Sequence, residues 1–400
     1  MTEQPSYRFA PAFEAPSGSA IRELFKYLSQ PGMISFAGGY PPPALFDQAG
    51  LAAAAERALR EAPIDCLQYA ATEGLPMLRE QLQALMARRG CPVALDELMV
   101  TTGSQQGLDL LIKVLLSPGD RVLVERPTYP ATLQALRLAG CALAGVATDA
   151  QGLSTEALAE QLAGQPRGHF RLLYCVPSFA NPTGACLPLA RRLALLALAA
   201  EHDFLIVEDD PYGALRFRGE ALPSLFALQN QVPGAQGRVV HLSSLSKVVA
   251  PGLRVGWMVA PLPVRQRCTI AKQTVDLCTS PWAQRIAAEY LAAGALEQHL
   301  PALVAGYRAK AERMLAGLAG LAEHLEVAPP EGGMFVWGRC RHGVQAREVF
   351  ERAVEHNVLF VPGAAFFGDQ PDPSSLRLSF AAPGLEAIDQ GLERLRAAFA

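Results

Sequence analysis

The chain has 400 residues, of which 50% are hydrophobic and 18% are charged, and its formal net charge at pH 7 is −3. This composition predicts a globular protein with a large core, and the weak acidic balance without basic runs argues against nucleic acid or an anionic membrane as a main partner. No apolar run reaches the roughly 18 residues of a membrane-spanning helix, and the first ten residues lack the features of a secretory signal peptide.

Eight cysteines are scattered along the chain, and none of them forms a C-x-x-C pair or accompanies a histidine cluster. Such scattering is typical of reduced, mostly buried thiols rather than of a zinc site or a disulfide framework. We therefore expect no metal site and a cytoplasmic location.

The N-terminal segment, residues 1–20, is rich in Pro, Ser and Ala and shows little periodicity. We expect it to be an arm that needs another surface to become ordered. A short helix is predicted from Ala20 to Ser29, with Ser19 as its N-cap.

Loops alternate with helices over the next sixty residues. Gly39 lies in a Gly-Gly turn before three prolines, where it permits close backbone approach to a ligand, although a plain turn has the same sequence. An Ala-rich helix is predicted for residues 51–60, and a second helix from Pro76 to a C-terminal glycine, Gly90. Tyr69 lies in the non-helical link between these helices.

Apolar strands alternate with helices from about Met99 to Val259, and this pattern predicts a doubly wound, mostly parallel sheet. Ser104 and Gln105 begin a helix directly after one strand, where unpaired N–H groups and the positive end of the helix dipole suit a phosphate. Many α/β proteins have such a turn, and this one lacks the lysine of a P-loop and the spacing of G-x-G-x-x-G.

Further polar residues follow the later strands, at the sheet edge where open α/β sheets bind ligands. Tyr129 and Asn181 each stand in a turn after a strand. Three adjacent acids, residues 208–210, end the apolar strand 204–207 and precede Tyr212. Buried acids are costly without a cationic partner, which a protonated cofactor ring would supply. A metal site and a solvated acidic turn are the alternatives for Asp209.

The stretch from residue 240 to 259 places Lys247 between two apolar strands, beside Ser244 and Ser246 and before Arg254. Burial and a nearby cation both lower the pKa of a lysine, and a neutral amine attacks carbonyls. Serine hydroxyls and an arginine suit a phosphate. An aldehyde that carries a phosphate indicates pyridoxal 5′-phosphate (PLP), bound as a Schiff base. A serine-rich loop with a surface lysine is the alternative.

The C-terminal part is predicted to be helical from Pro281 to about His324 and then to form a smaller α+β unit, with strands at 335–337, 358–361 and 376–380 and helices at 346–356 and 386–399. Arg377 alternates with apolar residues in the last strand. It could pair with a local acid or face water, but it also suits a carboxylate as a two-pronged donor. The expected domains are residues 1–50, an arm with part of the small domain; 51–290, the large domain; and 291–400, the small domain.

The motifs, taken in order, resemble the class I/II aminotransferases of PLP fold type I over nearly the whole chain. They are similar to the branch with the 2-aminoadipate and kynurenine aminotransferases. The motifs are SFAGGYPP, QYAATEGLPMLRE, TTGSQQGLDL, ERPTYP, NPTG, EDDPYG, SSLSKVVAPGLRVGW, EGGMFVW and LRLSF. The resemblance implies an α/β fold with a large domain, built on a mostly parallel seven-stranded type of sheet between helices, and a smaller α+β domain.

The resemblance also implies the residues that hold the cofactor. Lys247 would carry it and later move a proton, Asp209 would pair with the ring nitrogen, and Tyr129 would stack on the ring. Tyr212 and Asn181 would bond the ring oxygen. The phosphate would be held by Ser104, Gln105, Ser244, Ser246 and Arg254, joined by Tyr69 of the partner subunit in a homodimer with shared active sites.

For the substrate, the resemblance implies that Arg377 binds the α-carboxylate with help from Asn181 and the Gly39 amide. Arg22, on a mobile N-terminal helix, is the candidate for a distal carboxylate, with an ordinary surface residue as the equal alternative. The expected reaction moves an α-amino group from an amino acid to a 2-oxo acid, with 2-oxoglutarate as acceptor and ping-pong kinetics. Acidic and large apolar or aromatic amino acids are the expected donors.

Two other functions are compatible with these motifs. A β-lyase or a decarboxylase of the same fold type would use nearly the same residues. A regulator that carries an aminotransferase-like domain would need an additional basic N-terminal domain, and only about 20 residues precede the first predicted helix.

Overall fold

A computed structural model describes residues 7–14, 18 and 24–400. Its larger sheet has the strand order β2-β9-β8-β7-β6-β3-β4-β5. The strands are β2 (Leu98–Thr101), β3 (Arg121–Arg126), β4 (Ala142–Asp149), β5 (Gly152–Leu153), β6 (Leu172–Cys175), β7 (Leu205–Asp210), β8 (Val239–Ser244) and β9 (Gly256–Val259). Neighbours from β4 to β8 pair in parallel, whereas β9 is antiparallel to both β8 and β2. The predicted mostly parallel sheet is confirmed, and the two-residue β5 adds a strand that was not expected.

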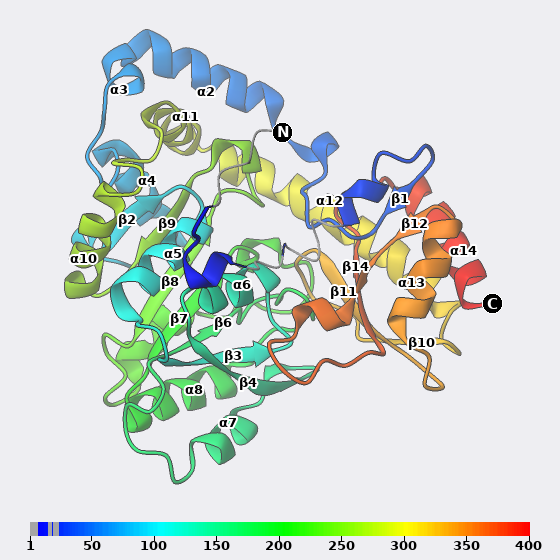
Figure 1. Ribbon diagram of the computed structural model, residues 1–400. Coiled ribbons are helices and arrows are strands. Elements are labelled where there is room, and N and C mark those ends of the chain that lie inside the picture. Colours follow the sequence, from blue (N-terminus) through cyan, green and yellow to red (C-terminus); the bar gives the residue numbers. More distant parts are fainter. Residues whose placement is uncertain (1–6, 15–17, 19–23) are drawn as a thin grey trace, which may run out of the picture.

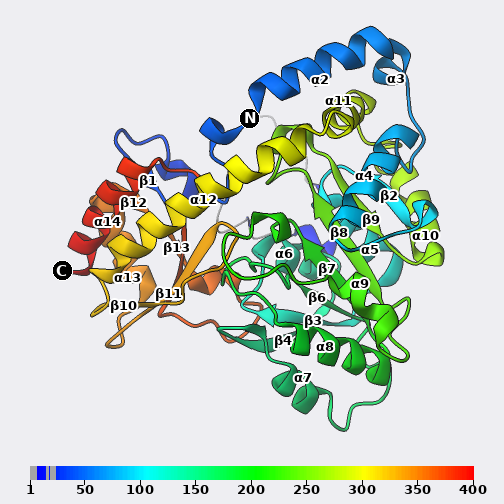
Figure 2. The same ribbon diagram turned by 180° about the vertical axis from the view of Figure 1, so that it is seen from behind.

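Helices cover both faces of this sheet (Figures 1 and 2). They are α5 (Ser104–Leu115), α6 (Pro130–Leu138), α7 (Thr155–Leu162), α8 (Leu189–His202), α9 (Leu225–Leu228) and α10 (Leu262–Gln273). Right-handed crossovers that run in opposite directions along a sheet place their helices on opposite faces. The connections through α5 and α6 run toward β4, and those through α8 and α9 run toward β8, so the two pairs lie on opposite sides.

The strands at the centre of the sheet are apolar because both faces are covered. Every residue of β2, β6, β8 and β9 is buried. Parallel strands in such a layered sheet show continuous apolar runs instead of alternation. The few polar side chains at strand ends, such as Asp209 and Ser244, are therefore exceptions that need partners.

A second group of helices packs beside the large sheet and leads to the small one. It comprises α2 (Gln48–Glu61), α3 (Pro63–Leu67), α4 (Pro76–Arg88), α11 (Pro281–Ala292) and α12 (Ala295–Ala319). The helical stretch predicted from Pro281 to about His324 consists of two helices, because the chain breaks at Gly294, whose φ of 66° is left-handed, and the second helix ends at Ala319. The helix α12 then runs from beside α11 to the C-terminal helix (Figure 1).

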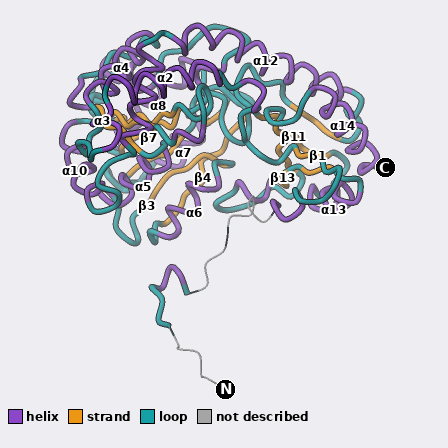
Figure 3. Tube along the Cα trace, turned by 90° about the horizontal axis from the view of Figure 1, so that it is seen from above, coloured by secondary structure: helices purple, strands orange, loops and turns teal. Residues whose placement is uncertain are grey.

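The smaller unit contains a four-stranded sheet of order β10-β11-β14-β13 and a two-stranded pair, β1 with β12. The strands are β1 (Ile34–Ser35), β10 (Leu325–Val327), β11 (Phe335–Cys340), β12 (Val358–Leu359), β13 (Val361–Pro362) and β14 (Ser375–Ser379), and the helices are α13 (Ala346–Glu355) and α14 (Leu385–Phe399). The predicted strand 358–361 is split, because β12 pairs with β1 while β13 pairs with β14. In the view from above, helices surround the strands of both units (Figure 3).

The predicted helix from Ala20 to Ser29 is only partly described. Ser19, Ala20 and Arg22 lie outside the described residues, and Leu24–Tyr27 forms a short 3-10 helix. In the part of the chain that the structure describes, no helix has the length and apolar character needed to cross a membrane.

Candidate active site

Twelve of the predicted site residues line one cavity of about 1010 Å³ at the carboxyl edge of the large sheet. They are Gly39, Ser104, Gln105, Tyr129, Asn181, Asp209, Tyr212, Ser244, Ser246, Lys247, Arg254 and Arg377. The cavity is also lined by residues that the sequence did not indicate, among them Tyr174, Gln134 and Phe335.

Strand direction explains why these residues meet. Ser104, Tyr129 and Asn181 follow β2, β3 and β6, and Lys247 follows β8. These four strands run in the same direction, so each residue stands at the edge where the strands end. Because β9 is antiparallel to β8, the start of β9 lies at the same edge. Arg254, which lies two residues before β9, is thereby brought to the cavity.

The turn before α5 has room for an anion because two glycines remove side-chain bulk. Gly103 has a φ of 77°, and a Cβ there would lie 2.7 Å from the Arg254 guanidinium. Gly256 packs so closely on the backbone of Gly103 and Ser104 that a Cβ would lie 2.6–2.8 Å from it. Arg254 Nη2 donates to Thr102 O at 3.4 Å. The guanidinium thus lies beside the first N–H groups of α5, where a phosphate would be bound.

Two serines add hydroxyl groups beside the Arg254 guanidinium and the start of α5. Ser244 Oγ donates to Ser246 Oγ at 2.7 Å, and the Ser246 backbone N–H donates to Ser244 Oγ at 3.0 Å. Both hydroxyls line the cavity beside Arg254. Hydroxyl, guanidinium and helix N–H donors together form the donor set expected for a phosphate.

The Lys247 amine also faces the cavity, where its Nζ donates to Gly39 O at 2.9 Å. Burial, together with the positive charges of Arg377 and Arg254, lowers its pKa to about 8. No carboxylate forms an ion pair with Lys247 among the described residues. At pH 7 about a tenth of this amine is therefore neutral, far more than at the usual lysine pKa, and the neutral form is the one that acts as a nucleophile or base.

Asp209 lines the cavity, and its two carboxylate oxygens have different surroundings. Tyr174 Oη donates to Asp209 Oδ2 at 2.7 Å. Asp209 Oδ1 is buried and has no hydrogen-bond partner among the described residues. Burial raises the pKa of this carboxyl to about 6. A cationic group placed against Oδ1 would satisfy the oxygen and keep the carboxyl ionised.

The other two acids of the predicted cluster have separate partners. Glu208 Oε2 lies 3.0 Å from His241 Nδ1, and both side chains are buried. The Glu208 carboxylate raises the pKa of His241, although burial acts in the opposite direction. Asp210 Oδ1 accepts the backbone N–H of Gly213 at 2.8 Å. Among the described residues no group of three or more His, Cys, Asp or Glu is arranged for a metal ion.

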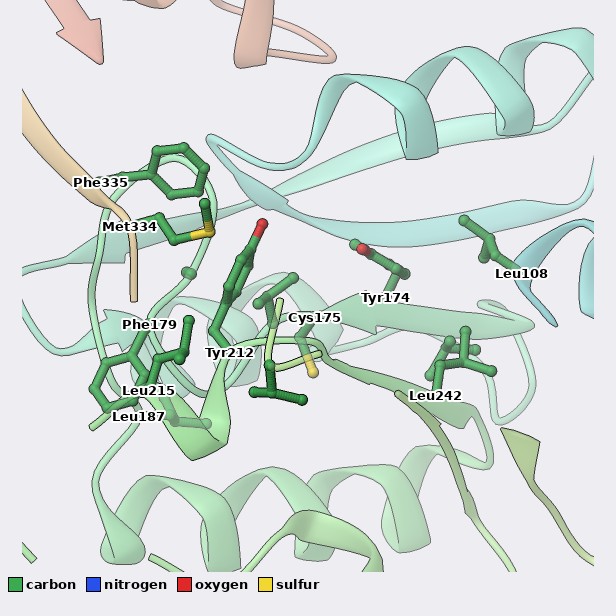
Figure 4. Packing of buried hydrophobic residues seen from close by; sticks show 14 of the residues in the cluster. Leu108, Tyr174, Cys175, Phe179, Leu187, Tyr212, Leu215, Leu242, Met334 and Phe335 are labelled. Atoms are coloured by element: carbon green, nitrogen blue, oxygen red, sulfur yellow. The ribbon is translucent and has the colours of Figure 1, made fainter. Parts of the chain in front are cut away.

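Aromatic rings form the walls of the cavity. The rings of Tyr212 and Phe335 meet edge to face, with centroids 5.8 Å apart (Figure 4). Burial raises the pKa of the Tyr212 phenol well above its usual value, so the hydroxyl stays protonated and can donate. Tyr129 lines the cavity at the start of α6.

Arg377 is a buried cation with a fixed orientation. Its side chain is 2% exposed, Nη1 donates to Asn181 Oδ1 at 2.7 Å, and Nη2 donates to Ala37 O. The guanidinium carbon lies 4.3 Å from the Phe335 ring centroid and 4.8 Å from that of Phe366. Among the described residues no acid pairs with Arg377, and its burial means that it does not face bulk water.

Tyr69 is the one predicted site residue, among those that the structure describes, that does not line the cavity of its own subunit. It is 78% exposed. Arg22 lies outside the described residues.

The described residues fit PLP. The unpartnered Asp209 Oδ1 suits a protonated pyridine nitrogen, the Lys247 amine suits an aldehyde, and the donors around Gly103 suit a phosphate. The spare donor Arg377 Nε, which is buried without a partner among the described residues, indicates further binding capacity beside the same cavity.

Comparisons with known proteins agree with a site for PLP. The family model for aminotransferase class I and II matches residues 42–395. The chain is 42% identical over 378 residues to 2-aminoadipate transaminase of Thermus thermophilus, covering 94% of this chain and 92% of the relative. It is 37% identical over 381 residues to aromatic-amino-acid aminotransferase 1 of Thermococcus litoralis, covering 94% and 90%. The crystal structure of Pyrococcus horikoshii kynurenine aminotransferase with PMP has a TM-score of 0.92 at 36% identity, covering 98% of this chain and 96% of that one.

Proposed function

The chain belongs to the class I and II aminotransferases and is a PLP-dependent aminotransferase, and from this we propose that it transfers an α-amino group from an amino acid to 2-oxoglutarate by a ping-pong mechanism. The observation that carries this proposal is the convergence of three groups on one cavity: the Lys247 amine, the unpartnered Asp209 oxygen and the Arg377 guanidinium.

Bound PLP supplies an aldehyde that reacts with amines and a protonated ring that accepts the electrons released when a substrate Cα–H bond breaks. The residues of the chain then have distinct tasks. Arg377 binds the substrate α-carboxylate, with Asn181 and the Gly39 N–H beside it. Lys247 Nζ, which is neutral in part at physiological pH, takes the proton from Cα. Asp209 Oδ1 holds the ring nitrogen in its protonated form.

Replacing Lys247 with Ala tests the proton transfer and the cofactor link together. We expect Lys247→Ala to lose turnover and the visible absorbance band of the bound cofactor while it keeps its fold. Full activity in this variant would overturn the assignment. The β-lyase and decarboxylase alternatives are separated by products, because amino transfer requires 2-oxoglutarate and forms glutamate, whereas a lyase releases ammonia and a decarboxylase releases carbon dioxide.

We further propose a homodimer in which Tyr69 completes the partner's phosphate site. Its 78% exposure, away from the cavity of its own subunit, supports this role, as do the exposed apolar neighbours Ile64 and Leu67. Mixing inactive Lys247→Ala protein with inactive Tyr69→Ala protein tests it. A hybrid dimer with shared sites contains one intact site, so activity returns on mixing. If Tyr69 acts within its own subunit, both sites of the hybrid remain damaged.

The proposed donors are acidic and large apolar or aromatic amino acids, in line with the names of the relatives. Arg22→Ala should slow transfer from glutamate more than transfer from leucine if Arg22 binds a distal carboxylate. Equal losses with both donors would remove Arg22 from that role.

We also propose domain boundaries near residues 50 and 290 and a cytoplasmic location. The large sheet lies within residues 51–290 and the four-stranded sheet lies within residues 291–400, which supports the boundaries. The eight cysteines are free thiols, as suits a reducing compartment.

A further inference from the structure

Tyr174 is a polar residue in an otherwise apolar strand, and its hydroxyl makes one contact that bears on the active site. It lies in β6, where every residue is buried, and its side chain is 0% exposed. Its register partner on β7 is Val207. Since alternate residues of a strand share a face, Val207 and Asp209 lie on the same face as Tyr174. The phenol therefore reaches diagonally across the strand pair to the carboxylate, with an O···O distance of 2.7 Å.

The hydrogen bond divides the two oxygens of Asp209 between two tasks. A phenol that stays protonated is a donor toward a carboxylate, and burial raises the pKa of Tyr174 well above its usual value. Oδ2 is thus occupied by Tyr174, while Oδ1 remains without a partner in the described residues. The carboxylate cannot rotate to exchange the oxygens without losing this bond. In Figure 4 the Tyr174 hydroxyl points toward the side of the site where Tyr212 lies.

We propose that Tyr174 is a positioning residue: its hydroxyl fixes the Asp209 carboxylate so that Oδ1 alone faces the protonated ring nitrogen of the cofactor. Because Tyr174 acts on a cofactor site, this role rests on the proposed function. Nothing in the motifs indicated it, since tyrosine is common in buried strands.

The same hydrogen bond favours the ionised form of Asp209. Burial raises the pKa of this carboxyl, and the bond from Tyr174 is the strongest of the effects that lower it again. The other groups that act on Asp209 are Asp210, which raises its pKa, and His241 and the Ser104 hydroxyl, which lower it. The Tyr212 phenol also faces the carboxylate, and the negative charge of Asp209 contributes to its raised pKa. Removing the Tyr174 hydroxyl should therefore raise the pKa of Asp209 and make its ionised form, which holds the ring nitrogen cationic, less stable.

Tyr174→Phe is the variant that tests this role, since it keeps the ring and removes only the hydroxyl. Tyr290→Phe is the matched control: Tyr290 is also 0% exposed, and its hydroxyl donates to a carboxylate, Asp47 Oδ2, at 3.0 Å. The measurements are the Kd for PLP, by titration of the apoprotein, and the ¹⁵N chemical shift of the ring nitrogen in ¹⁵N-labelled PLP bound to each protein from pH 6 to pH 9.

We expect Tyr174→Phe to weaken PLP binding about tenfold, the usual effect of losing one hydrogen bond to a charged group. Its ring nitrogen should lose the proton at a lower pH than in the unmodified protein. Tyr290→Phe should match the unmodified protein in both measurements. In an Asp209→Asn background, Tyr174→Phe should change the Kd less than about twofold, because the carboxylate through which Tyr174 acts is gone.

Tyr174 has only a structural role if Tyr174→Phe keeps the Kd and the ¹⁵N titration of the unmodified protein, or if the same loss persists with Asp209→Asn. If Tyr174→Phe fails to fold but folds when combined with Asp209→Asn, the hydroxyl still acts through the carboxylate and the proposal stands. If neither folds, the proposal is wrong. The unmodified protein decides the proposed function separately, through its own PLP binding and amino transfer.

Discussion

The burial that makes Lys247 useful should also make it destabilising. Its pKa is lowered from its usual 10.5 to about 8, so holding the charged amine in the fold costs free energy below pH 8. At about 1.4 kcal/mol for each pH unit between these values, the cost is about 3 kcal/mol. Lys247→Met removes this cost and also the hydrogen bond to Gly39 O, which is worth about 1 kcal/mol. We therefore expect apo Lys247→Met to be about 2 kcal/mol more stable than the unmodified apoprotein at pH 7.

The extra stability of Lys247→Met should vanish at alkaline pH, because the stability of the unmodified protein depends on how many protons its folded and unfolded forms bind. Between pH 8 and pH 10.5 the unfolded chain binds more protons at this lysine than the folded protein does, so the unmodified protein gains stability as the pH rises. At pH 10 the remaining cost is about 1 kcal/mol, which the lost hydrogen bond offsets. The two proteins should then be equally stable.

Urea unfolding of both apoproteins at pH 7 and pH 10, at one protein concentration, measures this difference. Lys113→Met is the control, because Lys113 is half exposed and pairs with Asp109 on the surface of α5. It should change stability by less than about 0.5 kcal/mol at both pH values. The reasoning is refuted if Lys247→Met is less stable than the unmodified protein at pH 7, or if its advantage is the same at pH 10.

Three further substitutions probe the cavity and its support. Arg377→Lys should lower kcat/KM about 100-fold and leave the Kd for PLP nearly unchanged, because lysine cannot reproduce the fixed donors of the guanidinium; steady-state kinetics and a PLP titration measure the two effects. Gly103→Ala should weaken PLP binding more than about tenfold, because its φ of 77° disfavours alanine and the new Cβ would displace Arg254; a PLP titration measures it. Lys272 is 0% exposed and donates to Asp276 Oδ1 at 2.6 Å, so Lys272→Met should destabilise the protein by about 2 kcal/mol. Lys272→Met combined with Asp276→Leu should recover part of this loss, and urea unfolding measures both effects.

The sequence identified those site residues that break an apolar pattern at a strand end. Asp209 and Lys247 were found in this way, because a charge next to a buried strand needs a reason. Arg377 was found because it interrupts an apolar strand, and the family resemblance grouped it with Asn181, although its contact with the Phe366 ring could not be predicted. Its contacts with Asn181 and Phe366 join segments far apart in the sequence, and only the folded chain brings them together.

Other features left too weak a signal in the sequence. The partner of Glu208 is His241, 33 residues away, and their pairing depends on the order of β7 and β8, which local patterns do not determine. Tyr174 stands in an apolar strand and belongs to none of the motifs, and its contact with Asp209 depends on the register of β6 and β7. The break at Gly294 was different, because a glycine in an Ala-rich helical stretch is a signal that could have been read.

The cavity holds two cations and an amine without a carboxylate paired to any of the three in the described residues, and the choice of side chain at each position explains how they coexist. Burial lowers the pKa of Arg377 to about 10, which still leaves it charged at neutral pH. The same environment lowers the pKa of Lys247 to about 8. A lysine at position 377, more deeply buried and without the planar contacts to Phe335 and Phe366, would give up its proton more readily still. One site therefore contains a permanent cation for a carboxylate and an amine that loses its proton near neutral pH, because the two positions carry different bases, and interchanging them would remove both properties.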